Sequence, residues 1–314
     1  MVKRSARNTL KPPIMLIGNV RSGTSMIHDF FNLHPEVAAW YEPRTIWTYA
    51  DPGRRHDRFD EHDATPKVTR YIRRRFLAYQ RGHDGLRVME KTPSNVMRIP
   101  YVRALFPESK LLYLVREPFA NLASSEKRWR TPITLEHAFE RIRETPKSQL
   151  HYYIGRAITD TLKSRALRRR HVSVWGVRYP GIYRDLRSMP IEQVIARQWA
   201  RCCRQAEEDF AKIDPGVALK LRYEDFVADP VVQFERILSH FDLAMTPELA
   251  RVVRRRVDPN RQTKWRDMDY NILRSCVPLL ESEMKRYGYE TPPELASGAR
   301  PSGPVMTRSD AAHG

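Results

Sequence analysis

Short apolar runs alternate with amphipathic stretches along much of the chain. Continuous apolar segments predict strands at 14–17, 86–91, 110–116 and 216–226. Helical spacing follows the first three of them, at 25–33, 94–105 and 118–129. Strands that are apolar throughout and separated by helices are typical of a parallel sheet covered on both faces. The pattern therefore predicts an α/β fold, with a central parallel sheet flanked by helices.

The rest of the pattern divides the chain into segments. Residues 134–212 are mainly helical and strongly basic, and we interpret them as an insertion beside the sheet. Residues 291–314 are rich in Pro, Gly, Ser and Ala, which predicts a disordered tail, and residues 1–12 form a basic extension. The remaining length fits one domain, 13–290, with one large core.

Composition adds a strong positive charge and few cysteines. The formal net charge of +18 favours anionic partners, among them phosphates, sulfates, acidic glycans, nucleic acids and anionic membranes. Cys202 and Cys203 are adjacent and poorly suited to a normal disulfide, and no His or Cys cluster has zinc-ligand spacing. No stretch resembles a signal peptide or a membrane span. We expect a cytoplasmic protein without a metal.

The turn after the first strand, GNVRSGTS, predicts an anion site. Gly18 and Gly23 stand at the Walker spacing, but Thr24 occupies the place of the Walker lysine and the positive charge is at Arg21. Backbone N–H groups, the positive end of the following helix and the hydroxyls of Thr24 and Ser25 can all face an anion. An ordinary Gly-Ser turn that enters a helix is the alternative interpretation.

A second anion signal follows the strand at 110–116. The strand ends at Arg116, Pro118 starts a helix, and Ser124 stands eight residues after the arginine. The two side chains can converge on one anion only if the helix folds back past the strand end. A surface ion pair and an exposed serine are the alternative.

Four segments, RSGTS, EKTPSN, LVREPFANLASS and LRYEDFVADP, resemble in this order the sulfotransferases that use 3′-phosphoadenosine-5′-phosphosulfate (PAPS). The resemblance runs from about residue 13 to 289 and is strongest to the tyrosylprotein sulfotransferases and their bacterial relatives. It implies a three-layer fold like that of the P-loop NTPases, PAPS as donor, adenosine 3′,5′-bisphosphate as product, and no metal. Departures are Val20, where many relatives have proline, and the REP sequence at Arg116.

The resemblance also implies residue roles. The 5′-phosphosulfate would be held by Arg21, Ser22, Gly23, Thr24 and Ser25. The 3′-phosphate would be held by Arg116 and Ser124, and a basic segment with Lys264 would close over the nucleotide. Lys91 would lie near the bridging oxygen, and Glu42 would be the catalytic base.

These residue types suit sulfuryl transfer. Cations at Lys91 and Arg21 would stabilise charge on the leaving oxygen, and Glu42 would take the acceptor's proton. Glu42 could instead only pair with Arg44. His34 is a second candidate base, although its place at a helix end favours a capping role. Alternation along a strand points Glu90 away from Lys91, so Glu90 is not expected to be catalytic.

The sequence thus favours sulfuryl transfer from PAPS to a hydroxyl of a carbohydrate, glycolipid or other metabolite. The basic insertion, which includes Trp175, Arg178 and Tyr179, has no clear counterpart in the tyrosylprotein enzymes and would suit an anionic acceptor. A P-loop-type kinase and a basic nucleic-acid-binding protein are the alternatives. The Walker lysine is absent, and the basic residues are spread along the chain without a nucleic-acid-binding motif.

Overall fold

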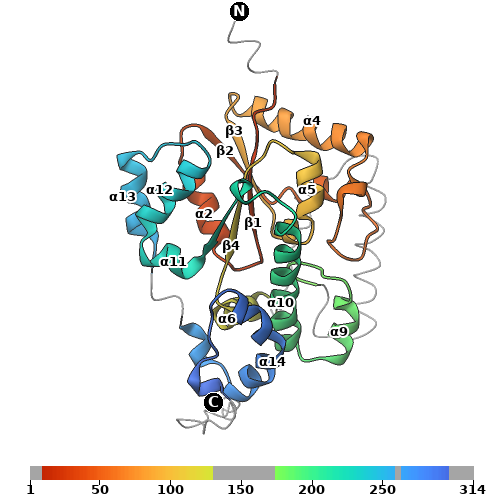
Figure 1. Ribbon diagram of the computed structural model, residues 1–314, viewed down its shortest axis with the longest axis vertical. Coiled ribbons are helices and arrows are strands. Elements are labelled where there is room, and N and C mark those ends of the chain that lie inside the picture. The colour runs from red at the N-terminus through yellow and green to blue at the C-terminus, as the bar shows by residue number, and fades with distance from the viewer. Residues whose placement is uncertain (1–8, 130–173, 259–262, 297–314) are drawn as a thin grey trace, which may run out of the picture.

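A computed structural model describes residues 9–129, 174–258 and 263–296, and in these ranges one parallel sheet forms the centre of the molecule (Figure 1). Its strand order is β2-β3-β1-β4-β5. The strands are β1 (Ile14–Gly18), β2 (Val37–Tyr41), β3 (Arg87–Lys91), β4 (Leu111–Val115) and β5 (Ala218–Arg222). The predicted α/β fold with a central parallel sheet is confirmed.

The register brings the carboxyl ends of the strands to one edge. Tyr41 at the end of β2 is paired with Lys91 at the end of β3, and Gly18 at the end of β1 is paired with Leu114 of β4. The chain leaves β1 toward β2 and β3 on one side, and later enters β4 on the other side. Ligands of open parallel sheets bind at the carboxyl edge where the strand order reverses in this way.

Helices cover both faces of the sheet (Figure 1). One face carries α2 (Thr24–Phe31), α11 (Tyr223–Ala228), α12 (Pro230–His240) and α13 (Pro247–Arg256). The other face carries α4 (Pro66–Gly82), α5 (Ile99–Leu105), α6 (Pro118–Trp129), α10 (Ile191–Phe210) and α14 (Tyr270–Arg286). Two short helices belong to this second layer, α3 (Arg44–Trp47), which contacts α4, and α9 (Ile182–Ser188), which contacts α10.

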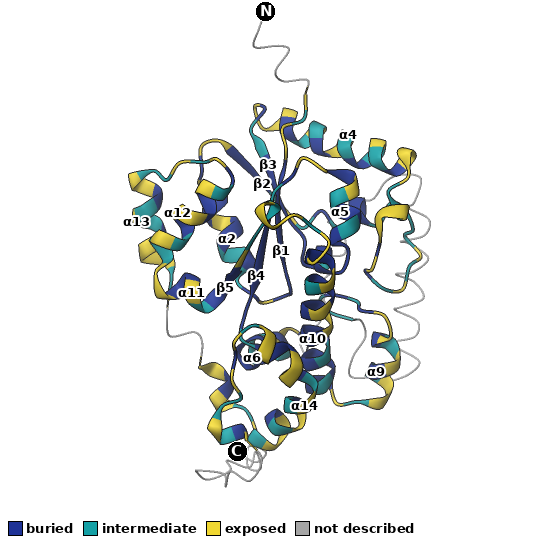
Figure 2. Cartoon of the chain, viewed as in Figure 1, coloured by how far each residue is buried: buried dark blue, intermediate teal, exposed yellow. Residues whose placement is uncertain are grey.

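Strand alternation divides the core into two clusters, one for each face. In β1, Ile14 and Leu16 pack in the cluster under α2 and α12, whereas Met15 and Ile17 pack in the cluster under α5 and α10. All five residues of β1 and of β4 are buried (Figure 2). This burial on both sides explains why the strands are apolar throughout.

The predicted elements are present with shifted ends. The strand expected at 216–226 is β5 only to Arg222, because α11 begins at Tyr223. The helix expected at 94–105 starts as a 3₁₀ helix, Pro93–Met97, before α5. Strand β2 and helix α4 were not predicted. No helix in the ranges placed by the structure is long and apolar enough to cross a membrane.

The predicted segment boundaries meet the structure only in part. Residues 130–173 of the basic segment lie outside the described residues, and its last part is α10, which packs between α6 and α14 in the core. The tail begins later than position 291, since the 3₁₀ helix Pro293–Leu295 buries Leu295. Residues 9–12 also attach to the domain, because Lys11 donates its backbone N–H to Gln80 of α4.

Candidate active site

The loop between β1 and α2 has the backbone of an anion-binding turn. Gly23 precedes α2 in the left-handed region with φ +92°, and a Cβ there would lie 2.4 Å from Cδ2 of Tyr223. Glycine is therefore required both by conformation and by space. Ser22 is buried, and its hydroxyl has no hydrogen-bond partner among the residues that the structure describes. A buried hydroxyl without a partner is costly unless a ligand completes it.

The two segments that were predicted to bind anions meet at Arg21. Its Nε donates to Oγ of Ser124 in α6 at 2.8 Å, and Nη1 of Arg116 donates to its backbone oxygen at 3.2 Å. Burial, followed by the nearby charges of Arg128 and Arg116, lowers the pKa of Arg21. The helix after β4 thus folds back past the strand end, as convergence on one anion requires.

Tyr223 and Glu224 brace this arrangement from the start of α11. The guanidinium of Arg116 lies over the Tyr223 ring, 4.4 Å from its centroid, so the ring contacts both the arginine and Gly23. Glu224 accepts from the backbone N–H of Glu117 at 3.0 Å and from the Tyr289 hydroxyl at 2.7 Å. The segment LRYEDF therefore supports both the loop after β1 and the segment after β4.

Lys91 and Glu42 meet beside the loop. Nζ of Lys91 lies 2.6 Å from Oε1 of Glu42 and 3.2 Å from Oγ of Ser25 in the first turn of α2. It also lies over the ring of Tyr41, 4.3 Å from the centroid. Lys91 is only 2% exposed, so its ammonium is held between the loop and the carboxylate. The pairing of β2 with β3 produces this contact, because the residue before Glu42 is in register with Lys91.

Glu42 is held on both of its oxygens. Nε of Arg44 donates to Oε2 at 2.8 Å, opposite to the contact that Lys91 makes with Oε1. Glu42 has a left-handed backbone, with φ +47°, which a non-glycine residue adopts only when its surroundings enforce it. Burial would raise the pKa of Glu42, but Arg44 and Lys91 outweigh it and hold the pKa below its ordinary value. The pairing with Arg44 that the sequence left open is present.

Glu90 and His34 lie apart from this cluster. Glu90 is fully buried and accepts from Nε1 of Trp47 at 3.0 Å and from Nδ2 of Asn95 at 2.9 Å, as well as from Thr92. It faces away from the partners of Lys91, as strand alternation predicts. His34 uses both ring nitrogens at the end of α2, with the carbonyl of Ala244 and the N–H of Glu36. Neither partner lies in α2, so the ring joins the turn before β2 to the loop before α13 and does not cap the helix itself.

Lys264 opens a 3₁₀ helix, Lys264–Asp267, that packs on α6 through Trp265, whose ring lies 5.8 Å from that of Phe119. Its side chain is exposed, and within the three described ranges no hydrogen bond or ion pair joins it to the loop after β1. A role of Lys264 at the nucleotide stays a prediction.

Sequence reasoning missed two contacts of this site. Tyr41 is 52% exposed, and its hydroxyl lies 3.4 Å from Oγ of Ser25. Arg44 entered only as a rival partner of Glu42, although it holds the carboxylate directly. The signal for both was the segment VAAWYEPR, an apolar run that ends in charged residues, which predicts a strand whose carboxyl end meets the other loops.

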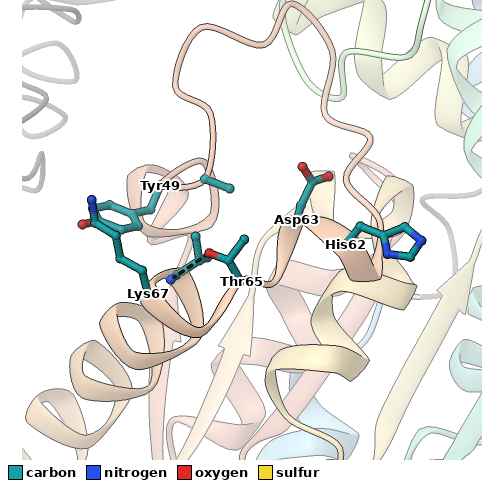
Figure 3. Close-up of a pocket in the computed structure, with 7 residues that line it drawn as sticks. Tyr49, His62, Asp63, Thr65 and Lys67 are labelled. Atoms are coloured by element: carbon teal, nitrogen blue, oxygen red, sulfur yellow. Dashed lines mark hydrogen bonds between the residues drawn. The ribbon is translucent and has the colours of Figure 1, made fainter.

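A cavity of about 430 Å³ lies beside the start of α4 (Figure 3). It is lined by Tyr49, Ala50, His62, Asp63, Thr65, Lys67 and Val68. None of these residues belongs to the cluster of Arg21, Lys91 and Glu42. Across the part of the chain that the structure places, no three His, Cys, Asp or Glu side chains are grouped so as to hold a metal.

Known proteins share this fold over most of the chain. The sulfotransferase domain from the curacin biosynthetic pathway superposes with a TM-score of 0.54 at 13% identity, covering 90% of this chain and 100% of that one. Sulfotransferase STF9 from Mycobacterium avium gives 0.53 at 12% identity, covering 90% of this chain and 78% of that one. At such low identity these likenesses show the fold alone, and they confirm the predicted three-layer architecture.

Sequence comparison identifies more specific relatives. Protein-tyrosine sulfotransferase 2 from Gallus gallus is 30% identical over 129 residues, which are 38% of this chain and 35% of that protein. Nodulation protein NoeE from Sinorhizobium fredii is 26% identical over 139 residues, 38% of this chain and 32% of that protein. The chain thus matches about a third of the length of these relatives. Residues 12–187 and 164–247 match the sulfotransferase family, and because this match covers most of the chain, the protein belongs to that family.

Proposed function

We propose that the protein transfers a sulfuryl group from PAPS to an acceptor hydroxyl of a carbohydrate, glycolipid or other metabolite. The observation that best supports this proposal is one continuous cluster of side chains at the carboxyl edge of the sheet. Arg21 joins Arg116 and Ser124 on one side of the loop, and Lys91 joins Ser25 and Glu42 on the other. Both ends of a molecule with two separate anionic groups would meet matching donors there.

The loop fits the 5′ end of the donor. Ser22 offers a buried hydroxyl without a partner, and the N–H groups of Thr24 and Ser25 precede the hydrogen bonds of α2, which begin where Met26 donates to Gly23. Arg116 and Ser124 would hold the 3′-phosphate, which distinguishes PAPS from ordinary nucleotides. When bound, PAPS supplies the sulfuryl group and an adenosine 3′,5′-bisphosphate leaving group.

Three side chains would carry the reaction. Lys91 and Arg21 hold positive charge where the leaving oxygen becomes negative, and such preorganised charge stabilises a transition state more than the ground state. Glu42 accepts the proton of the acceptor hydroxyl as that oxygen forms its bond to sulfur. The cleaved sulfur–oxygen bond leaves its electron pair on the phosphate oxygen, so the step needs no oxidant or reductant.

The acceptor and the compartment belong to the same proposal. The two relatives named above match only a third of their own length, so their acceptors are not transferred to this chain. A net charge of +18 supports an acceptor that carries negative charge. Cys202, Cys203 and Cys276 are buried free thiols, which suits a reducing compartment such as the cytoplasm.

Calorimetric titration with adenosine 3′,5′-bisphosphate, AMP and ATP with magnesium tests the donor. We expect the bisphosphate to bind at least tenfold more tightly than AMP, because only it carries the 3′-phosphate. Equal or tighter binding of magnesium ATP would overturn the proposal in favour of a kinase. A screen of hydroxyl compounds with ³⁵S-labelled PAPS then identifies the acceptor.

A further inference from the structure

The Glu42 carboxylate has a different cation on each oxygen. Lys91 holds Oε1 at 2.6 Å, and Arg44 holds Oε2 at 2.8 Å through Nε. The two contacts differ in burial, because the Lys91 side chain is 2% exposed and that of Arg44 is 40% exposed. The Lys91 contact is therefore the less screened of the two.

Lys91 is shared between this carboxylate and the loop. Its ammonium contacts Oγ of Ser25 at 3.2 Å, so it already reaches the first turn of α2. An ammonium has three donors that can be redirected by small side-chain movements. An anion bound at the loop would therefore compete with Glu42 for the same cation.

Arg44 is placed to keep Glu42 in position during such an exchange. Its backbone N–H donates to the backbone oxygen of Glu42 at 2.6 Å, while its side chain holds Oε2. These two contacts, one to the backbone of Glu42 and one to its side chain, hold its left-handed backbone conformation in place. Neither of them involves the loop after β1, so donor binding need not disturb them.

We propose that the Lys91 ammonium exchanges its contact with Glu42 for one with the bound donor. Donor binding then frees Oε1 of Glu42 for the acceptor's proton, while Arg44 acts as a positioning residue. This inference rests on the proposed function. Without donor, both oxygens are engaged and the carboxylate is a poor base. With donor, only Oε2 remains paired. The enzyme therefore binds the donor first and becomes competent for the acceptor afterwards.

The charges around Glu42 support this exchange. The described groups that set its pKa are Arg44 from α3 and Lys91 from β3, which together outweigh burial and lower it. Loss of the Lys91 contact therefore raises the pKa of Glu42 and increases its basicity. In the same step the positive charge of Lys91 moves toward the leaving oxygen, where the reaction needs it.

Affinity for PAPS tests the exchange without any acceptor. The four proteins are the wild type, Glu42→Gln, Lys91→Met and the double variant, each titrated calorimetrically with PAPS. Because Glu42 competes for Lys91, Glu42→Gln should tighten PAPS binding by roughly three- to tenfold, a range typical of contacting pairs. In the Lys91→Met background the same substitution should change the affinity by less than about twofold.

Two control variants separate competition from a general gain of positive charge. Asp29→Asn removes a charge from an exposed side chain of α2 and should change PAPS affinity by less than about twofold. Arg44→Gln removes the other partner of Glu42 and should leave binding unchanged or weaken it, because Glu42 then holds Lys91 more strongly. Circular dichroism melting checks that each variant folds, and Lys91→Gln replaces Lys91→Met if the latter does not.

The outcomes distinguish the inference from the proposed function. If the wild type fails to bind PAPS, both the proposed function and the exchange are wrong. If the wild type binds PAPS but Glu42→Gln binds equally or more weakly, only the exchange is wrong. The exchange is also overturned if the gain persists fully in the Lys91→Met background, since the effect would then come from net charge alone.

Discussion

Arg21 and Ser124 are joined by a hydrogen bond of 2.8 Å although they lie 103 residues apart in the chain. One belongs to the loop after β1 and the other to the helix after β4, and the parallel pairing of these two strands brings both to the same edge of the sheet. The loop cation and the predicted 3′-phosphate residue are therefore parts of a single surface. A ligand that binds one of them lies within reach of the other.

Arg116→Ala should weaken binding of adenosine 3′,5′-bisphosphate by roughly ten- to a hundredfold, because hydrogen bonds to charged groups contribute about 1.5–3 kcal/mol. Binding of AMP, which lacks the 3′-phosphate, should weaken by less than about threefold. Calorimetry with both nucleotides measures the two changes. Arg251→Ala removes an equal charge from the exposed face of α13 and serves as the control. An equal loss for both nucleotides would assign Arg116 to loop support only.

Gly23→Ala should destabilise the protein by roughly 1–3 kcal/mol, because φ is +92° and the added Cβ would lie 2.4 Å from the ring of Tyr223. The displaced loop should also lose nucleotide affinity. Urea unfolding and nucleotide titration measure the two effects. Gly82→Ala is the matched control, since an added Cβ there meets nothing within 4 Å. Gly23→Ala with wild-type stability would show that the turn tolerates a side chain.

The sequence predicted those parts of the site that are local in the chain. The loop from Gly18 to Ser25 was recognisable because glycine, hydroxyl and cationic residues stand between an apolar run and a helix. Arg116 and Ser124 were recognisable because strand end, Pro118 and helix follow one another directly. In both segments the candidate functional residues lie within a few positions of a strand end and a helix start, so local physical rules are sufficient to predict them.

Contacts that depend on strand register could not be predicted from such local rules. Lys91 meets Glu42 because Tyr41 pairs with Lys91 across β2 and β3, and β2 itself was missed as a five-residue run between two prolines. Tyr223 supports Gly23 from 200 positions away, which no local pattern encodes. The opposite directions of Glu90 and Lys91 were predictable, because alternation within one strand is a local property.

The free energy of unfolding of Glu90→Gln, relative to that of wild type, should increase between pH 5 and pH 8. Burial raises the pKa of Glu90 to about 7 from 4.5, despite donors at Thr92 and Trp47 and the charges of Arg98 and Lys91. A carboxyl whose pKa is raised by folding stabilises the protein at low pH, and this contribution is lost as the pH rises from the unfolded value through the folded one. The glutamine variant lacks this loss.

Urea unfolding of wild type and Glu90→Gln at pH 5 and pH 8 measures the difference. The variant should gain roughly 2–3 kcal/mol relative to wild type between the two pH values, as a shift of this size implies. Glu290→Gln, at an exposed carboxyl, is the control and should show no such change. If the difference for Glu90→Gln stays constant, the carboxylate is ionised in the folded protein and its three donors outweigh burial.

Glu42→Gln should lower turnover of the acceptor found in the PAPS screen by roughly a hundredfold or more, because general base catalysis typically contributes that much. PAPS binding should not weaken, since the substituted side chain contacts no part of the donor loop except through Lys91. Initial rates at saturating PAPS and calorimetric titration measure the two properties. Glu36→Gln, at an exposed carboxyl before β2, is the control.

The pH profile adds a second criterion for the role of Glu42. Without donor, Arg44 and Lys91 both lower its pKa, and Arg44 still does so after Lys91 has moved to the donor, so wild-type turnover should remain high across the neutral range and fall only when the medium becomes acidic enough to protonate Glu42. Arg44→Gln removes one of these cations and should move the acidic limb of the profile to higher pH, whereas Arg44→Lys should restore much of the original profile. If Glu42→Gln retains full turnover, the base is another group and the ion pairs of Glu42 only hold Lys91 in place.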